Sequence, residues 1–258
     1  MGVVNVTPDS FSDGGRYHDP DAAIAHARQL VRDGADILDI GGEATNPRAT
    51  PISADEELAR VLPVLRGLAG CGARLSIDTT KAEVARAAIE AGATIVNDVS
   101  GGLFDPAIGA ACDHPDVTYI VGHLRGTTLA EVFAAEQAPT WNEVAAELAA
   151  RLGALPAAVA ARAWVDPGLG FGKGSDPEGN LELIRHSGEL AHSLGRPVVV
   201  GPSRKRFLRR ILGGEPSELA LDAASLAACL AAARAGASVL RAHNVALLRA
   251  GLTVYTKI

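Results

Sequence analysis

The sequence predicts a single α/β domain, residues 1–258, folded as a (β/α)8 TIM barrel. Three observations lead to this prediction. Short runs of β-branched residues occur eight times, and amphipathic helical patterns lie between most of them. The length of 258 residues also agrees with the roughly 250 residues typical of such barrels. An open, doubly wound sheet is the alternative, but sheets of that kind usually have only about six strands.

Each predicted strand is a short apolar run bounded by polar or turn-forming residues. The eight predicted strands are residues 3–6, 37–40, 75–77, 94–96, 117–121, 163–165, 197–200 and 238–240. One connection allows two interpretations, because residues 127–139 could form either a long loop or a short helix followed by a turn.

The helices between the strands are predicted from their start signals. Asp19-Pro20 and Asp176-Pro177 each place an N-cap residue before a proline, which is favoured at the first helical position. Three further helices are predicted from capping-box spacings, which pair Ser53 with Glu56, Thr80 with Glu83, and Thr140 with Glu143.

The composition argues against several classes of protein. The formal net charge is −6 and aromatic residues make up 4% of the chain, so neither a basic face nor an aromatic platform for nucleic acid is expected. The apolar run around residues 223–240 contains Arg234, which predicts a packed helix and strand and not a membrane span. Cys71, Cys112 and Cys229 are odd in number and far apart, which is typical of reduced thiols in a cytoplasmic protein.

A glycine-rich loop follows the sixth predicted strand, with the sequence Asp166-Pro167-Gly168-Leu169-Gly170-Phe171-Gly172-Lys173. Glycines at this density allow the backbone to turn tightly beneath a flat ligand, and a carboxylate at the end of a buried strand needs a partner. The glycine spacing of a P-loop or of a dinucleotide-binding loop is not met. The loop therefore predicts a ligand site without identifying the ligand.

Polar residues stand at the carboxyl end of every predicted strand, where barrel enzymes build their sites. In strand order they are Asn5, Asp39, Asp78, Asn97, His123, Asp166, the run Ser203-Arg204-Lys205, and Arg241 with His243. We expect them to share one rim with two halves. One half, formed by Asp78, Asn97, Asp166 and Lys205, suits the amide and amino edge of a heterocycle. The other half is a cationic patch suited to phosphate oxygens, formed by Arg241, His243 and Asn5, with Arg204 as a further candidate.

Motifs in the same positions resemble those of the dihydropteroate synthase family of pterin-binding barrels, and they cover essentially the whole chain. The matching segments are residues 1–15, 39–43, 76–79, 97–100, 123–126, 166–173, 203–205 and 241–243. The resemblance implies that 6-hydroxymethyl-7,8-dihydropterin pyrophosphate condenses with 4-aminobenzoate to give 7,8-dihydropteroate and pyrophosphate in folate synthesis. It also implies a homodimer.

The resemblance implies a role for each site residue. Asp78, Asn97, Asp166 and Lys205 would bind the pterin, and Asn5, Arg241 and His243 the pyrophosphate. Asn5 would be the protein ligand of Mg²⁺, which commonly binds through substrate phosphates and few protein oxygens. The aminobenzoate would meet Thr45, Arg48, Ser203 and Arg204. The catalytic set would be Asp78, Asp166, Lys205, Arg241 and His243.

The sequence departs from the family pattern mainly in its second loop, where Asn46 replaces the usual arginine and Arg48 stands two residues later. Milder departures are Gly122, in place of a usual methionine, and Asn244, where aspartate is common. Two other functions fit less well. A pterin-binding paralogue without this activity would explain the altered loop, whereas a methyltetrahydrofolate-binding methyltransferase module has no use for residues 203–205 or 241–243.

Overall fold

Six parallel strands follow one another in sequence order in the computed structural model, which describes residues 1–7, 20–47 and 49–258. These strands are β1 (Gly2–Asn5), β2 (Ile37–Gly41), β3 (Arg74–Asp78), β4 (Ile95–Asp98), β5 (Thr118–Gly122) and β6 (Trp164–Asp166). The short strands β7 (Val199–Val200) and β8 (Val239–Leu240) pair with each other, also in parallel.

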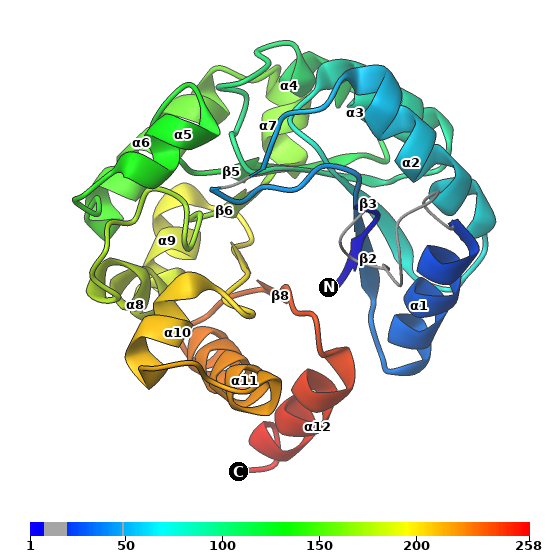
Figure 1. Ribbon diagram of the computed structural model, residues 1–258. Helices are drawn as coiled ribbons and strands as arrows, with labels where there is room; N and C mark the ends of the chain where they lie inside the picture. The colour runs from blue at the N-terminus through cyan, green and yellow to red at the C-terminus, as the bar shows by residue number, and fades with distance from the viewer. Residues whose placement is uncertain (8–19, 48) are drawn as a thin grey trace.

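Two single bridges join the two groups of strands into a ring. Val165 in β6 pairs with Val198, just before β7, and Gly2 in β1 pairs with Ala242, just after β8. Figure 1 views the ring along its axis, with the helices outside the strands. The predicted (β/α)8 barrel is therefore confirmed.

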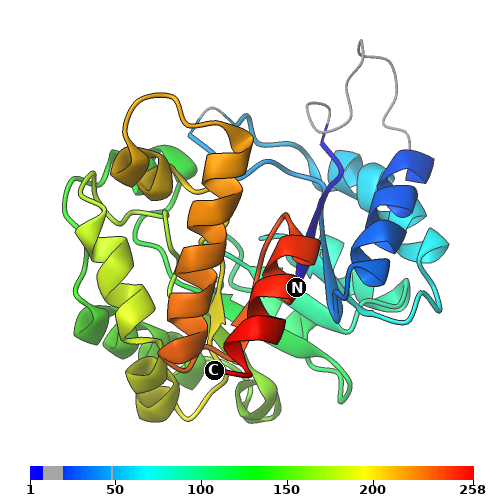
Figure 2. The ribbon, with the colours of Figure 1, turned by 90° about the horizontal axis from the view of Figure 1, so that it is seen from below.

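Helices connect the strands on the outside of the ring. They are α1 (Pro20–Arg32), α2 (Ala54–Gly67), α3 (Ala82–Glu90), α4 (Ile108–Ala111), α5 (Leu129–Ala134), α6 (Trp141–Gly153), α7 (Ala157–Arg162), α8 (Glu178–Arg185), α9 (Ser187–Leu194), α10 (Arg206–Leu212), α11 (Glu218–Arg234) and α12 (Val245–Tyr255). The last two lie side by side next to β8 (Figures 1 and 2). Among the described helices, none combines the length and apolar character that a membrane span requires.

The helix starts agree with the sequence in part. Thr140 begins α6 with a complete capping box, and the side chain of Ser53 caps α2. The prediction for Thr80 was wrong, since the N-cap of α3 is the next residue, Lys81, which makes no side-chain cap hydrogen bond. Helix α8 likewise begins after Pro177, although Asp176 Oδ1 still accepts a hydrogen bond from the Glu178 amide. The undecided segment 127–139 contains the short helix α5.

Alternation along the strands separates two layers of apolar side chains. Residues such as Val4, Leu38 and Ile77 belong to the main core beneath the helices. Their strand neighbours belong to a smaller cluster inside the barrel, formed by Met1, Ile37, Ile95, Ile120 and Val199. Because side chains alternate with a period of two, residues two and four positions further along the inner face point into the barrel toward its carboxyl end.

Candidate active site

A pocket of about 440 Å³ lies at the carboxyl ends of the strands. Every residue to which the family resemblance gave a role, and which the structure describes, lines it. These residues are Asn5, Thr45, Asp78, Asn97, Asp166, Ser203, Arg204, Lys205, Arg241 and His243. Arg48 lies outside the described residues. The barrel thus gathers side chains from distant parts of the chain around one cavity.

The guanidinium of Arg241 joins two carboxylates across the barrel. Its Nε lies 2.6 Å from Asp39 Oδ2, and its Nη2 lies 2.7 Å from Asp78 Oδ2. Asp39 is completely buried and also accepts hydrogen bonds from Ser76 Oγ and Asn97 Nδ2, at 2.6 and 3.0 Å. This arrangement fixes the guanidinium, and it orients the Asn97 amide from below.

The shared cation affects the protonation of its neighbours. Burial, followed by the charge of Asp39, raises the pKa of Asp78 to about 7, with Arg241 opposing the rise. Burial alone would lower the pKa of Arg241, but the two carboxylates outweigh it and hold this pKa above its usual range. Arg241 therefore stays charged, whereas Asp78 can exchange a proton near neutral pH.

Asp166 stands at the end of β6, at the start of the glycine-rich loop. Its Oδ1 accepts a hydrogen bond of 2.7 Å from the Gly168 amide. The Lys205 ammonium donates to the carbonyl of Leu169 and lies 4.4 Å from the centre of the Phe171 ring. Burial raises the pKa of Asp166, opposed chiefly by Lys205, and burial lowers the pKa of Lys205 to about 8. Opposite charges thus face the pocket side by side, each costly to bury alone.

His243 is paired with Ser203 at the edge of the pocket. The Ser203 hydroxyl lies 3.0 Å from His243 Nδ1, and the backbone amide of His243 donates to the same oxygen at 3.2 Å. Burial, followed by the charge of Arg241, lowers the pKa of His243 to about 4. The predicted cationic patch therefore needs a correction, because His243 is neutral at pH 7 and only Arg241 of this pair carries charge.

Arg204 has a positive φ of 59° and lines the pocket, but its guanidinium is committed to a neighbour. Its Nε and Nη2 lie 2.8 and 3.1 Å from the two carboxylate oxygens of Asp222. Asn244 also donates to Asp222, at 2.9 Å, and Ser225 Oγ accepts from the Arg204 amide at 2.9 Å. The predicted contact of Arg204 with aminobenzoate would therefore have to compete with this bidentate ion pair.

A partly buried ion cluster that sequence analysis missed holds the second loop, which brings Thr45 to the pocket. Lys81 Nζ lies 2.7 Å from Glu43 Oε2 and 2.6 Å from the fully buried Glu57 Oε2. Glu43 Oε1 accepts a hydrogen bond of 2.9 Å from the Ile52 amide, which closes the loop. The conspicuous signal was Glu43 itself, in the motif Gly41-Gly42-Glu43. Its partners on α2 and before α3 could not be identified from spacing.

Comparison with known proteins agrees with this geometry. The model of the pterin binding enzyme family matches residues 1–243. The chain belongs to the pterin binding enzyme family. Among similar relatives, the dihydropteroate synthase of Mycobacterium leprae is 43% identical, with 95% of this chain and 88% of the relative covered.

Two further relatives of this pterin-binding chain are a longer protein and a protein of known structure. A folate synthesis bifunctional protein of Arabidopsis thaliana is 40% identical over 95% of this chain, which spans about half, 53%, of that relative. A solved structure of dihydropteroate synthase from Xanthomonas albilineans, in complex with 7,8-dihydropteroate, has a TM-score of 0.82 and 41% identity. The match covers 100% of this chain and 92% of the solved chain.

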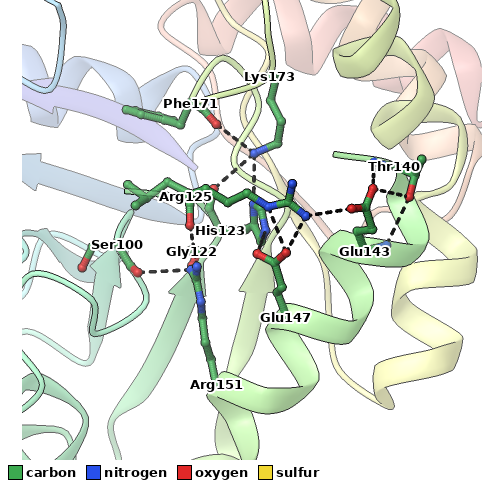
Figure 3. A network of polar contacts seen from close by, with 11 residues as sticks. Ser100, Gly122, His123, Arg125, Thr140, Glu143, Glu147, Arg151, Phe171 and Lys173 are labelled. Atoms are coloured by element: carbon green, nitrogen blue, oxygen red, sulfur yellow. Dashed lines mark hydrogen bonds and ion pairs between the residues drawn. The ribbon is translucent and has the colours of Figure 1, made fainter. Parts of the chain in front are cut away.

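Two rim predictions for this pterin-binding barrel were wrong, and alternation explains both. Gly41, not Asp39, ends β2 level with Asp78, so Asp39 lies one layer deeper inside the barrel. Gly122 ends β5 level with Asp166, so the next residue, His123, points to the opposite face of the sheet. His123 is completely buried there, between Lys173 and Glu147 (Figure 3).

Other residues line the pocket of this family member that sequence reasoning did not single out. They include Phe133, Phe171 and Arg206. Phe171 lies in the glycine-rich loop and Arg206 in the basic run after β7, so position could have indicated both. Phe133 lies on α5, whose existence was undecided, and no sequence signal pointed to it.

The family resemblance implies a magnesium ion, and the pocket offers it a single predicted protein ligand. Asn5, the predicted ligand, is exposed at the pocket wall. Within residues 1–7, 20–47 and 49–258, no group of three or more His, Cys, Asp or Glu side chains is placed to hold a metal ion. A single amide oxygen suits Mg²⁺ where phosphate oxygens and water supply the other ligands. The donor set therefore fits an ion that binds together with a pyrophosphate.

Proposed function

We propose that this chain is a dihydropteroate synthase, which joins 6-hydroxymethyl-7,8-dihydropterin pyrophosphate to 4-aminobenzoate with release of pyrophosphate. One observation carries the proposal: a single pocket brings the carboxylate Asp166, the cation Lys205 and the ion pair of Arg241 with Asp78 to the same rim. The names of the similar relatives support it.

The pterin end is assigned to the half of the pocket around Asp166 and Asn97. A carboxylate accepts two N–H groups in one plane, so Asp166 suits the amino and ring N–H edge of a pterin. The ammonium of Lys205 lies beside it and donates to carbonyl or ring nitrogen acceptors. Gly122 and Gly201 also line the pocket, and neither presents a side chain to a flat bicyclic ring.

The pyrophosphate is assigned to Arg241, His243 and Asn5. Arg241 supplies the permanent charge, and the neutral His243 can donate one hydrogen bond from Nε2 because its Nδ1 lies against the Ser203 hydroxyl. Asn5 offers the amide oxygen that would hold Mg²⁺ at the phosphate oxygens. The bound ion would supply positive charge that stabilises the leaving group.

The reaction then requires no nucleophile from the protein. The bond between the pterin methylene and the pyrophosphate oxygen breaks, and the electron pair leaves with the pyrophosphate, whose charge Arg241 stabilises. Asp166 and Asp78 stabilise the ring-conjugated cation that remains. The aminobenzoate nitrogen attacks the methylene and loses a proton to solvent or to pyrophosphate. Its carboxylate is assigned to the side of the pocket near Ser203 and Thr45.

The test is release of pyrophosphate by the purified chain with magnesium, measured with and without aminobenzoate. We expect release that depends on both substrates and yields dihydropteroate. Tight pterin binding without any release would identify a binding paralogue, and no binding of the pterin pyrophosphate would refute the proposal. The proposal includes a homodimer, as the resemblance implies, and a cytoplasmic location, as the unpaired cysteines favour. Sedimentation of the purified chain tests the dimer.

A further inference from the structure

Lys173 closes the glycine-rich loop from behind and does not line the pocket. Its side chain is 2% exposed, and its Nζ lies 2.9 Å from the carbonyl of Phe171 and 3.1 Å from His123 Nδ1. A third contact of 3.3 Å joins Nζ to the carbonyl of His123 (Figure 3). The charged side chain has three N–H donors, one for each of these acceptors, although burial lowers the pKa of Lys173 to about 7.

The same contacts determine the state of His123. Burial, followed by the charges of Lys173 and Arg151, lowers the pKa of His123 to about 2, so the ring is neutral. Its Nδ1 accepts from the ammonium, which places the single ring proton on Nε2. Nε2 then donates to Glu147 Oε2 on α6, at 2.9 Å. Glu147 is held in turn by Arg125, whose Nε and Nη2 lie 2.9 and 2.6 Å from Oε1.

This network touches the backbone that carries the pterin-facing groups. The amide of His123 donates to the carbonyl of Asp166 at 3.0 Å. The loop also lies directly on His123, because a Cβ added to Gly168 would stand 1.8 Å from the His123 carbonyl oxygen. Lys173 therefore lies behind the loop, while Gly168, Gly170 and Phe171 face the pocket on its other side.

We propose that Lys173 is a positioning residue, which acts through His123 in its Nε2–H form to hold residues 166–172 in the conformation that binds the pterin. The inference rests on the proposed function only in naming the pterin as the ligand of this loop. Lys173 is not a catalytic residue, because the loop lies between its ammonium and the cavity.

Two substitutions of His123 separate this role from simple filling of space. In His123→Asn, the side-chain oxygen takes the approximate place of Nδ1 and still accepts from Lys173. In His123→Gln, the amide nitrogen takes the approximate place of Nε2 and still donates to Glu147, but the acceptor for Lys173 is lost. Both variants lose the ring, so a histidine that only fills space predicts equal effects.

The first measurement is the affinity of each variant for the pterin pyrophosphate, by calorimetry at pH 7. Loss of a hydrogen bond to a charged group predicts about tenfold weaker binding for His123→Gln and Lys173→Met, with His123→Asn within about threefold of the unmodified chain. The KM for aminobenzoate should change little in all three. Equal weakening in both histidine variants, or unchanged affinity in Lys173→Met, would overturn the inference.

The second measurement needs no ligand and so separates this inference from the proposed function. Nitrogen-15 NMR of the histidine side chains should show His123 with its proton on Nε2, and Lys173→Met should shift the Nδ1 signal as that atom loses its donor. A proton on Nδ1, or a signal unaffected by Lys173→Met, would contradict the network. If the NMR result holds but the unmodified chain binds no pterin, the proposed function fails and the network stands.

Discussion

Arg241 and Asp78 form an ion pair across the rim of the barrel, with Nη2 and Oδ2 2.7 Å apart. The pair joins the half of the pocket assigned to pyrophosphate with the half assigned to the pterin. The same guanidinium also neutralises Asp39, so one cation holds two carboxylates. One side chain therefore belongs to both halves of the site.

Arg241→Ala should abolish turnover and also destabilise the fold. Without the guanidinium, the completely buried Asp39 loses the cation with which it is paired, and breaking a buried pair costs roughly 3–5 kcal/mol. Urea unfolding and pyrophosphate release measure the two effects. In the double variant with Asp39→Asn, the free energy of unfolding should recover in part while turnover stays absent. Turnover near the unmodified level in Arg241→Ala would show that pyrophosphate binds elsewhere.

Asp166→Asn should abolish turnover without loss of stability. Burial raises the pKa of Asp166, which means that the folded protein disfavours the ionised carboxyl, and a neutral amide of the same shape avoids this cost. The amide cannot accept two N–H groups in one plane, so pterin affinity should fall by about tenfold or more. Thermal unfolding and calorimetry check the two parts. A large drop in the melting temperature would instead assign Asp166 a structural role.

Stability should rise with pH through the range in which His243 is neutral only in the folded state. Burial lowers its pKa from the ordinary value of 6.5 to about 4, so between these values the unfolded chain binds more protons. The free energy of unfolding then increases with pH, by up to about 1.4 kcal/mol per pH unit. The measurement is urea unfolding at several pH values, with His243→Asn as the comparison. The prediction fails if the slopes of the two proteins are the same.

Gly168→Ala should destabilise the loop far more than Gly195→Ala. Both glycines have positive φ, 73° and 60°, so both substitutions strain the backbone by about 1 kcal/mol. Only at Gly168 would the new methyl group meet a backbone atom, 1.8 Å from the His123 carbonyl, whereas nothing lies within 4 Å at Gly195. Thermal unfolding of the two variants gives the comparison, and pterin affinity should fall in Gly168→Ala alone.

Asn46→Arg should change the KM for aminobenzoate more than the affinity for the pterin. Asn46 lines the pocket on the second loop, away from the strand ends that carry the pterin-facing residues. An arginine adds a cation that can pair with the aminobenzoate carboxylate. Steady-state kinetics with each substrate varied in turn measures the two effects. If only the affinity for the pterin changes, the second loop must instead be assigned to the pterin end of the site.

The barrel and the rim could be predicted for two reasons. Short apolar runs mark the strands, and in a (β/α)8 barrel the carboxyl ends of all strands meet at one rim. This reasoning located Asp78, Asp166 and Arg241 at one pocket. It failed at Asp39 and His123 because an error of one or two residues in a strand end changes the layer or the face of a side chain. Asp39 proved to lie one layer down, and His123 proved to point outward.

Ion pairs between residues on different elements could not be predicted from the sequence. Nothing in the spacing of Arg204 and Asp222 indicates their bidentate pair, and nothing links Lys81 to Glu57 on another helix. The charge of His243 also depends on burial and on Arg241, which only the folded arrangement supplies. Patterns along the chain give position, but protonation depends on surroundings.

The contact between Arg241 and Asp39 spans 202 residues of sequence. A ribosome must therefore add 202 residues after Asp39 before this carboxylate meets its cation. Until Arg241 has been synthesised, Asp39 has no guanidinium partner in the incomplete barrel. Truncated translation products that end before the eighth strand should consequently be poor at folding and ready targets for chaperones and proteases.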